Sequence, residues 1–116
     1  MSEKVVLVIG GDMAKDVKKI IEDPSKAEVE ADLKIYVESV EQLASILSAK
    51  KMNLLQYIQH HKDQSIGEIA SKIGRKQEAV SRDVHILKKH GILTLKKKGK
   101  KIIPETKTKK ITVEFG

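Results

Sequence analysis

The side chains best suited to directional hydrogen bonding with a ligand are concentrated in one segment, QEAVSRDVHILKKH, residues 77–90. A helix over this segment, at about 100° per residue, places three apolar side chains within about 60° of one another: Val80, Val84 and Leu87. The opposite face is polar and carries Glu78, Ser81, Arg82, His85 and Lys89. The segment is therefore predicted to bury one face and to present the other to a partner.

The outward side chains match the hydrogen-bonding groups of a DNA major groove. Arg82 can donate two hydrogen bonds to guanine, and Gln77, near the helix start, can pair with adenine. Ser81 and His85 offer single hydrogen bonds to base edges or phosphates. The competing interpretation is an ordinary solvated helix face.

The charged residues in and before this helix include cations, which attract phosphate, and carboxylates, which repel it. Arg75 and Lys76 precede the helix and are suited to phosphate contacts. Glu78 and Asp83 count against a purely electrostatic surface, because unpaired carboxylates repel phosphate. They can instead cap the helix or accept hydrogen bonds from an arginine, and Glu78 can accept from a cytosine amine.

A lysine-rich run, LKKKGKKII, follows the helix closely. The alternation of ILTL and KII on either side of KKKGK predicts a β-hairpin. Beside the helix, its tip would lie on the DNA backbone or in the minor groove and supply charge rather than sequence information. The alternative is a mobile solubilising loop. The lysines concerned are Lys96, Lys97, Lys98, Lys100 and Lys101.

The elements before this helix complete a recognisable order. Ser65 and Glu68 have capping-box spacing at the start of SIGEIASKI, and Gly74 ends that helix. Two short helices joined by a glycine turn indicate a helix-turn-helix. A helix from Ser48 through MNLLQYIQHH comes before them, preceded by a shorter one that opens at Ser39. Helices followed by a hairpin predict a winged helix, with KITVEF as a last strand.

The N-terminal part has a different pattern. KVVLVIGG and LKIYVES are predicted strands, MAKDVKKIIEDP is a predicted helix, and residues 25–32 are a predicted loop. No G-x-G-x-x-G follows the first strand, so a dinucleotide site is not indicated. The expected fold is α+β, mainly α: an N-terminal strand-helix-strand extension over residues 1–38 and a winged helix-turn-helix DNA-binding domain over residues 39–116. The spare apolar strands predict a homodimer in which residues 1–38 supply the contact.

Composition narrows the function classes. The 116 residues carry a net charge of +7, but residues 1–50 sum to −3 and residues 51–116 to +10, a segregation that attracts polyanions. Aromatic residues make up 3%, which disfavours single-strand binding by base stacking. Without cysteine, a signal-peptide pattern or a long apolar run, a soluble cytoplasmic protein without membrane contact is expected. The four histidines lack ligand spacing and no catalytic motif is present, so neither a metal, a cofactor nor an enzyme activity is expected.

The sequence also resembles a family of small archaeal and bacterial winged-helix proteins, predicted transcriptional regulators related to the MarR and ArsR groups. The resemblance depends on MNLLQYI, SIGEIASKIGR, AVSRDVHILKKHGIL and IIPETKTKKITVEF, the last closing the wing. In that family a strand, a helix and a strand precede the winged helix, so the resemblance spans nearly the whole chain. It implies DNA binding through the helix that carries Val80, Ser81, Arg82, Asp83 and His85.

These patterns together predict a sequence-specific regulator, a repressor, that binds double-stranded DNA as a homodimer. Two alternatives stay open. Some relatives resemble antitoxins, which implies an adaptor that binds a partner toxin and its own promoter. The lysine content also permits a nonspecific, architectural DNA-binding protein.

Overall fold

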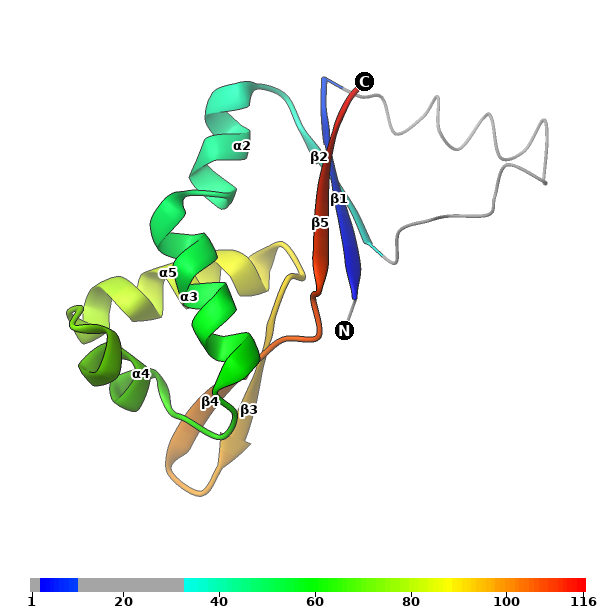
Figure 1. Cartoon of the computed structure of the whole chain (residues 1–116). Coiled ribbons are helices and arrows are strands. Elements are labelled where there is room, and N and C mark those ends of the chain that lie inside the picture. Colours follow the sequence, from blue (N-terminus) through cyan, green and yellow to red (C-terminus); the bar gives the residue numbers. More distant parts are fainter. Residues whose placement is uncertain (1–2, 11–32) are drawn as a thin grey trace.

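The structure is a computed structural model, and it describes residues 3–10 and 33–116. The predicted α+β winged helix-turn-helix fold is confirmed. The predicted helix of MAKDVKKIIEDP and the loop 25–32 lie outside the described residues. The described elements, in chain order, are β1 (Lys4–Ile9), β2 (Leu33–Val37), α2 (Val40–Ile46), α3 (Ala49–His60), α4 (Ile66–Ile73), α5 (Gln77–Lys89), β3 (Thr94–Lys98), β4 (Lys101–Glu105) and β5 (Lys110–Phe115) (Figure 1).

The first and last strands of the chain belong to one sheet. Its order is β2-β1-β5 and both pairings are parallel, with Leu7 opposite Ile35 on one side and Val113 on the other. The expectation that the last strand closes the wing is therefore wrong, because β5 leaves the hairpin and pairs with β1 (Figure 1). The physical reason is that pairing with β1 places Ile111 of β5 against the core that β1 shares with the helices.

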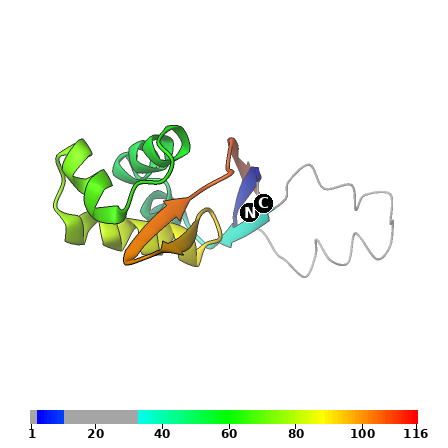
Figure 2. The same cartoon turned by 90° about the horizontal axis from the view of Figure 1, so that it is seen from below.

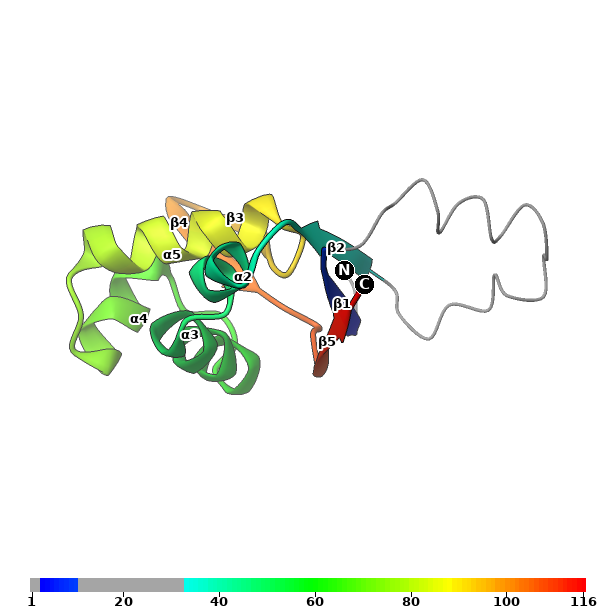
Figure 3. The ribbon, with the colours of Figure 1, turned by 90° about the horizontal axis from the view of Figure 1, so that it is seen from above.

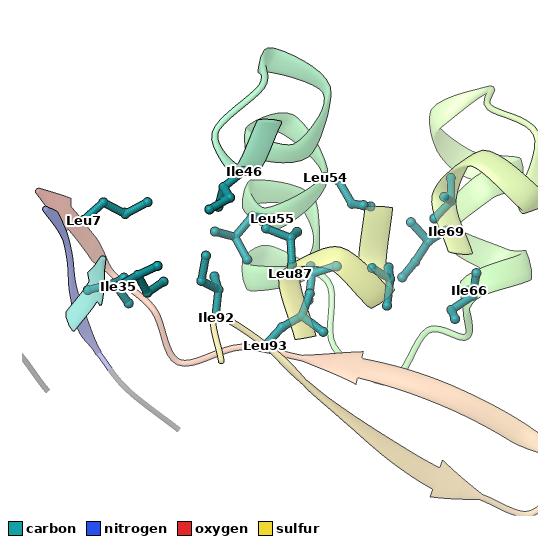
Figure 4. Packing of buried hydrophobic residues seen from close by; sticks show 14 of the residues in the cluster. Leu7, Ile35, Ile46, Leu54, Leu55, Ile66, Ile69, Leu87, Ile92 and Leu93 are labelled. Carbon is teal, nitrogen blue, oxygen red and sulfur yellow. The ribbon is translucent and has the colours of Figure 1, made fainter. Parts of the chain in front are cut away.

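One hydrophobic core joins this sheet to the helices. Side chains from one face of the sheet, among them Leu7 and Ile35, belong to the same buried cluster as side chains from the helices (Figure 4). Ile46, Leu55 and Leu87 come from α2, α3 and α5 and occupy its middle (Figure 4). Because the core is shared, the sheet supports the position of the helices.

Polar side chains determine where the helices begin. The Ser65 hydroxyl accepts from the Glu68 N–H and the Glu68 carboxylate accepts from the Ser65 N–H, both at 3.2 Å, so the predicted capping box of α4 is confirmed. At α2 the Ser39 hydroxyl accepts from the Gln42 N–H at 3.1 Å. The Gln42 side chain reaches one residue further back, to the Glu38 N–H at 2.8 Å. None of the helices in the described ranges combines the length and apolar character of a membrane span.

Candidate nucleic-acid interface

A tight turn sets the angle between α4 and α5. Gly74 ends α4 with φ 70°, a left-handed conformation that costs glycine little. The N–H groups of Gly74 and Arg75 both donate to the Ala70 carbonyl, which closes the helix end. The next helix begins at Gln77 and ends at Lys89, one residue before the predicted end. The predicted helix-turn-helix is therefore present.

Helix α5 buries the face that its periodicity indicates. Val80, Val84 and Leu87 are all fully buried. Arg82 and His85 are exposed on the opposite side, and Ser81 is half-buried between the two faces. Lys89 is also exposed, in the last turn of the helix. The outward set is thus arranged as the helical wheel predicts.

Asp83 is the carboxylate of α5 that turns inward. It is 6% exposed, and its Oδ2 accepts a hydrogen bond of 2.8 Å from Nη2 of Arg75. Lys51 Nζ, from α3, lies 3.7 Å from Asp83 Oδ1. Of the roles left open for Asp83, acceptance from an arginine is the one observed. The negative charge is therefore held by two cations beneath the outer face of α5.

The same ion pair changes the interpretation of Arg75. Its guanidinium is directed at Asp83, and its side chain is 20% exposed. The predicted phosphate contact of Arg75 is untested, but this cation already serves to connect the turn to α5. Lys76, in contrast, is exposed.

The start of α5 has no side-chain cap. Lys76 occupies the N-cap position without a side-chain hydrogen bond. The first N–H groups of a helix have no partner within the helix, and they form a natural site for a phosphate oxygen. The side chain of Gln77 lies over α4, since a Cβ at Gly67 would be 3.4 Å from Gln77 Oε1.

The ring of His85 has a defined orientation. Its Nδ1 lies 2.6 Å from the carbonyl oxygen of Ser81 and 3.5 Å from the Ser81 hydroxyl. Because a carbonyl oxygen only accepts, Nδ1 carries the proton in this contact. The other ring nitrogen, Nε2, is then an acceptor in the neutral ring and a donor in the protonated one. His85 can therefore accept from a base amine or, when charged, donate to guanine or phosphate.

The lysine run forms the predicted hairpin. Strands β3 and β4 are antiparallel, with Lys98 opposite Lys101 and Gly99–Lys100 as the two-residue turn. The φ angle of Gly99 is 62°, whereas the φ angle of Lys100 is negative. This sign pattern is that of a type II′ turn, which favours glycine at its first position. The lysine run is thus part of a paired hairpin, the wing.

The five wing lysines fall into two groups, although all are exposed. Lys101 Nζ is 3.0 Å from Glu68 Oε1 on α4, and Lys96 Nζ is 3.9 Å from Glu105 Oε1. Within the part of the chain that the structure describes, Lys97, Lys98 and Lys100 have no ion-pair partner. The wing therefore has two lysines with internal contacts and three whose charge is directed only to solvent.

Glu68 connects the wing to the helix-turn-helix. The hydrogen bond from Lys101 lowers the pKa of this carboxyl below its usual value, and hydrogen bonds from Ser65 lower it further. Its charged form therefore caps α4 and at the same time holds the wing next to its turn. Sequence spacing does not reveal this contact, because the two residues are 33 positions apart.

Helix α5 and the wing lie along the same side of the domain. Views from below and from above show α5, β3 and β4 on the side of the domain away from α3 (Figures 2 and 3), and in Figure 1 the hairpin lies below α5. The helix and the hairpin are therefore both available to one extended polyanion on this side of the domain.

The histidines show no sign of a metal site. Over residues 3–10 and 33–116, no group of three His, Cys, Asp or Glu side chains is placed to hold a metal ion. Burial lowers the pKa of His90, at the end of α5, and neighbouring Lys89 lowers it further. His61 stacks on Tyr57, with ring centroids 4.0 Å apart.

Sequence reasoning missed the support beneath α5. Lys51 was not singled out, and no local pattern connects α3 to Asp83. Asp83 itself carried a signal, since it lies three residues after Val80 and so flanks the apolar stripe of the helix. A carboxylate at such a position needs a cation nearby.

The helix-turn-helix, the paired wing strands and the shared core define a winged helix-turn-helix protein. Two solved structures have a similar fold. The transcriptional regulator HlyU from Vibrio vulnificus CMCP6 has a TM-score of 0.51 and 19% identity, over 81% of this chain and 84% of that one. Reduced HlyU from Vibrio cholerae N16961 has a TM-score of 0.50 and 17% identity, over 77% and 80%. At such identities the likeness concerns the fold.

The HVO_A0114 family model matches residues 46–113, which is more than half of the chain. The chain therefore belongs to the HVO_A0114 family. The matched region runs from the end of α2 into β5 and includes the whole candidate interface. A search of curated proteins finds no match. The relationship to the MarR and ArsR groups stays a prediction.

Proposed function

We propose that this protein is a transcriptional regulator, a repressor, that binds double-stranded DNA in a sequence-specific manner. Helix α5 enters the major groove and the wing lies along the backbone. The observation that carries the proposal is the separation of charges around α5. Asp83 is turned inward against Arg75 and Lys51, whereas Arg82 and His85 are exposed on the other face of the helix. The wing adds three exposed lysines that have no ion-pair partner among the described residues: Lys97, Lys98 and Lys100.

Arg82 is the proposed reader of sequence. It is exposed on the outer face of α5, with no ion pair to another described residue, so its fork of donors is free to contact guanine O6 and N7. His85 is oriented by the Ser81 carbonyl and presents Nε2 to a neighbouring base or phosphate. Gln77 and Ser81, at the start and on the flank of the helix, are the proposed accessory contacts.

The proposed backbone contacts surround this reading face. Lys76 and the uncapped N–H groups of α5 approach one phosphate, and Lys89 approaches another from the last turn. Lys97, Lys98 and Lys100 supply positive charge from the wing. Lys96 and Lys101 can contribute in addition, although each already has an acidic neighbour.

The functional unit is proposed to be a homodimer, with residues 1–38 contributing to its contact and residues 39–116 forming the DNA-binding domain. A two-fold axis would present two copies of α5 to half-sites about one helical turn apart, roughly 10 bp. The operator is then expected to be palindromic.

Selection of bound sequences from random duplex DNA tests the proposal. A recurring motif with two related half-sites is expected, and the selected duplex should bind far more tightly than a random one at physiological salt. Equal affinity for both duplexes, with a steep salt dependence, would instead support the architectural alternative. Co-purification of a stoichiometric small protein from native lysate would support the antitoxin-type adaptor.

A further inference from the structure

Strand β5 is at one edge of its sheet, and no described strand pairs with its outer side. The N–H of Gly116 donates to the Ile9 carbonyl at 2.8 Å, and the N–H of Lys110 donates to the Glu3 carbonyl at 3.1 Å. Even-numbered residues of β5 therefore direct their backbone groups toward β1. Because strand residues alternate, the N–H and C=O groups of Ile111, Val113 and Phe115 point away from the sheet. Such an edge is a template for another strand.

The side chains on this edge are more apolar than a solvated edge requires. Ile111, Val113 and Phe115 alternate onto the face of the sheet that packs against the helices, in register with Val5, Leu7 and Ile9. Ile111 packs against the core, but Val113 is 38% exposed and Phe115 is 83% exposed. Phe115 is also the sole phenylalanine of the chain. Exposed apolar side chains beside free backbone groups indicate that this strand is covered by a partner.

The charge order of β5 is complementary to itself. Lys110 and Glu114 lie at equal distances on either side of Thr112. When two copies of β5 run antiparallel about Thr112, each Lys110 is opposite the Glu114 of the other copy. Ile111 is then opposite Val113, and the outward backbone groups of these two residues face each other as a hydrogen-bonded pair. Opposite charges directly across an antiparallel pair are stabilising.

Other registers lose this match. A shift by one residue places apolar side chains opposite charged ones on the wrong face. A shift by two residues places Lys110 opposite Gly116 and leaves Glu114 opposite Thr112. A parallel arrangement in register brings like charges together, which is destabilising.

A groove beside β5 can receive the side chain of Phe115 from the second copy. It has a volume of about 330 Å³ and lies between α3 and the start of β5, where Met52, Leu55 and Gln56 face Lys109 and Ile111. In the register centred on Thr112, Phe115 of the second copy lies opposite Lys109, on the helix side of the sheet. Its ring is thereby directed to this groove.

We propose that β5 is the dimer interface: the strand pairs antiparallel with β5 of a second copy and forms a continuous sheet of order β2-β1-β5-β5-β1-β2. The β5 pairing specifies the contact surface of the homodimer in the proposed function, and its biological role rests on that function. It moves the main contact from residues 1–38 to the C-terminal strand, while β1 and β2 extend the shared sheet.

Charge exchange in the full-length protein tests the interface. Lys110→Glu and Glu114→Lys each place like charges opposite each other at two symmetric positions, so each variant should raise the dimer dissociation constant by about tenfold or more. The double variant K110E/E114K restores unlike charges and should dimerise as wild type does. An equimolar mixture of the two single variants should form the heterodimer, because unlike charges again face each other.

Sedimentation velocity over a range of protein concentrations measures these constants, and circular dichroism checks the fold of each variant. Lys107→Glu is the matched control, since it makes the same charge change in the connection before β5 and should leave the dimer intact. Phe115→Ser should also weaken the dimer without loss of the monomer fold, because the side chain is exposed.

Three outcomes would overturn the interface: a wild-type monomer at micromolar concentration, single variants that dimerise as tightly as wild type, or a double variant that does not recover. DNA titrations on the same samples separate this from the proposed function. A wild-type dimer that responds to charge exchange as expected but binds no duplex supports the interface and contradicts DNA binding.

Discussion

Replacement of Asp83 by Asn removes the charge that holds α5 against the turn and α3. The carboxylate is 2.8 Å from Arg75 Nη2 and 3.7 Å from Lys51 Nζ, and the three side chains are 8%, 20% and 11% exposed. Breaking one partner of a buried pair costs about 3–5 kcal/mol, and a hydrogen bond to a charged group contributes about 1.5–3 kcal/mol. Because the cations retain some solvent, we expect a loss of about 2–3 kcal/mol in the free energy of unfolding.

The guanidinium has little alternative support. Nη1 of Arg75 is buried and has no hydrogen-bond partner among the described residues. The effects of Arg75→Met and Asp83→Asn should therefore be strongly non-additive, with a coupling above about 1 kcal/mol in a double-mutant cycle.

Urea unfolding followed by circular dichroism, at one fixed protein concentration, measures these energies. Glu78→Gln is the matched control, because it removes an exposed carboxylate from the first turn of the same helix and should cost less than about 1 kcal/mol. If Asp83→Asn costs no more than this control, or if the two single changes are additive, the ion pair does not hold α5 in place.

Two further changes act on the wing. Loss of Lys97 and Lys98 to alanine should weaken binding to all duplexes alike and flatten the salt dependence by about 0.9 per lost phosphate contact. Anisotropy titrations at several salt concentrations measure the slope of log affinity against log salt, and the control K4A/K34A should leave this slope unchanged. Equal slopes for wild type and the wing variant would show that the wing does not contact the DNA. Glu68→Gln should make the free energy of unfolding less dependent on pH in acid. The pKa of Glu68 is lowered in the folded protein, so its carboxylate stabilises the fold above about pH 4.3, and this stabilisation is lost as the pH falls through the pKa of the folded state. Urea midpoints between neutral and strongly acid pH test this, and parallel curves for the two proteins would contradict it.

Local patterns predicted the winged helix well because its signals are short in range. The capping box of Ser65 and Glu68, the left-handed Gly74 and the apolar face of Val80 and Leu87 each depend on a few neighbouring residues. The hairpin followed from the change of period around Gly99.

Contacts between distant segments could not be predicted in this way. The strand KITVEF was correctly expected, but its pairing with β1 depends on which edge is free once the whole sheet is assembled. The same holds for Lys51 with Asp83 and for Lys101 with Glu68, where the partners come from separate elements. The candidate reading face was therefore accessible from the sequence, whereas the ion pairs that position it were not.

The central claim is that Arg82 on α5 reads base pairs while the wing holds the backbone. The most direct measurement is the affinity of wild type and Arg82→Ala for the selected duplex and for each of its single base-pair variants. We predict that the substitution abolishes about 1–3 kcal/mol of discrimination at one or two positions in each half-site and leaves the other positions unchanged. An unchanged discrimination profile, or a uniform loss of affinity at every position, would contradict the claim.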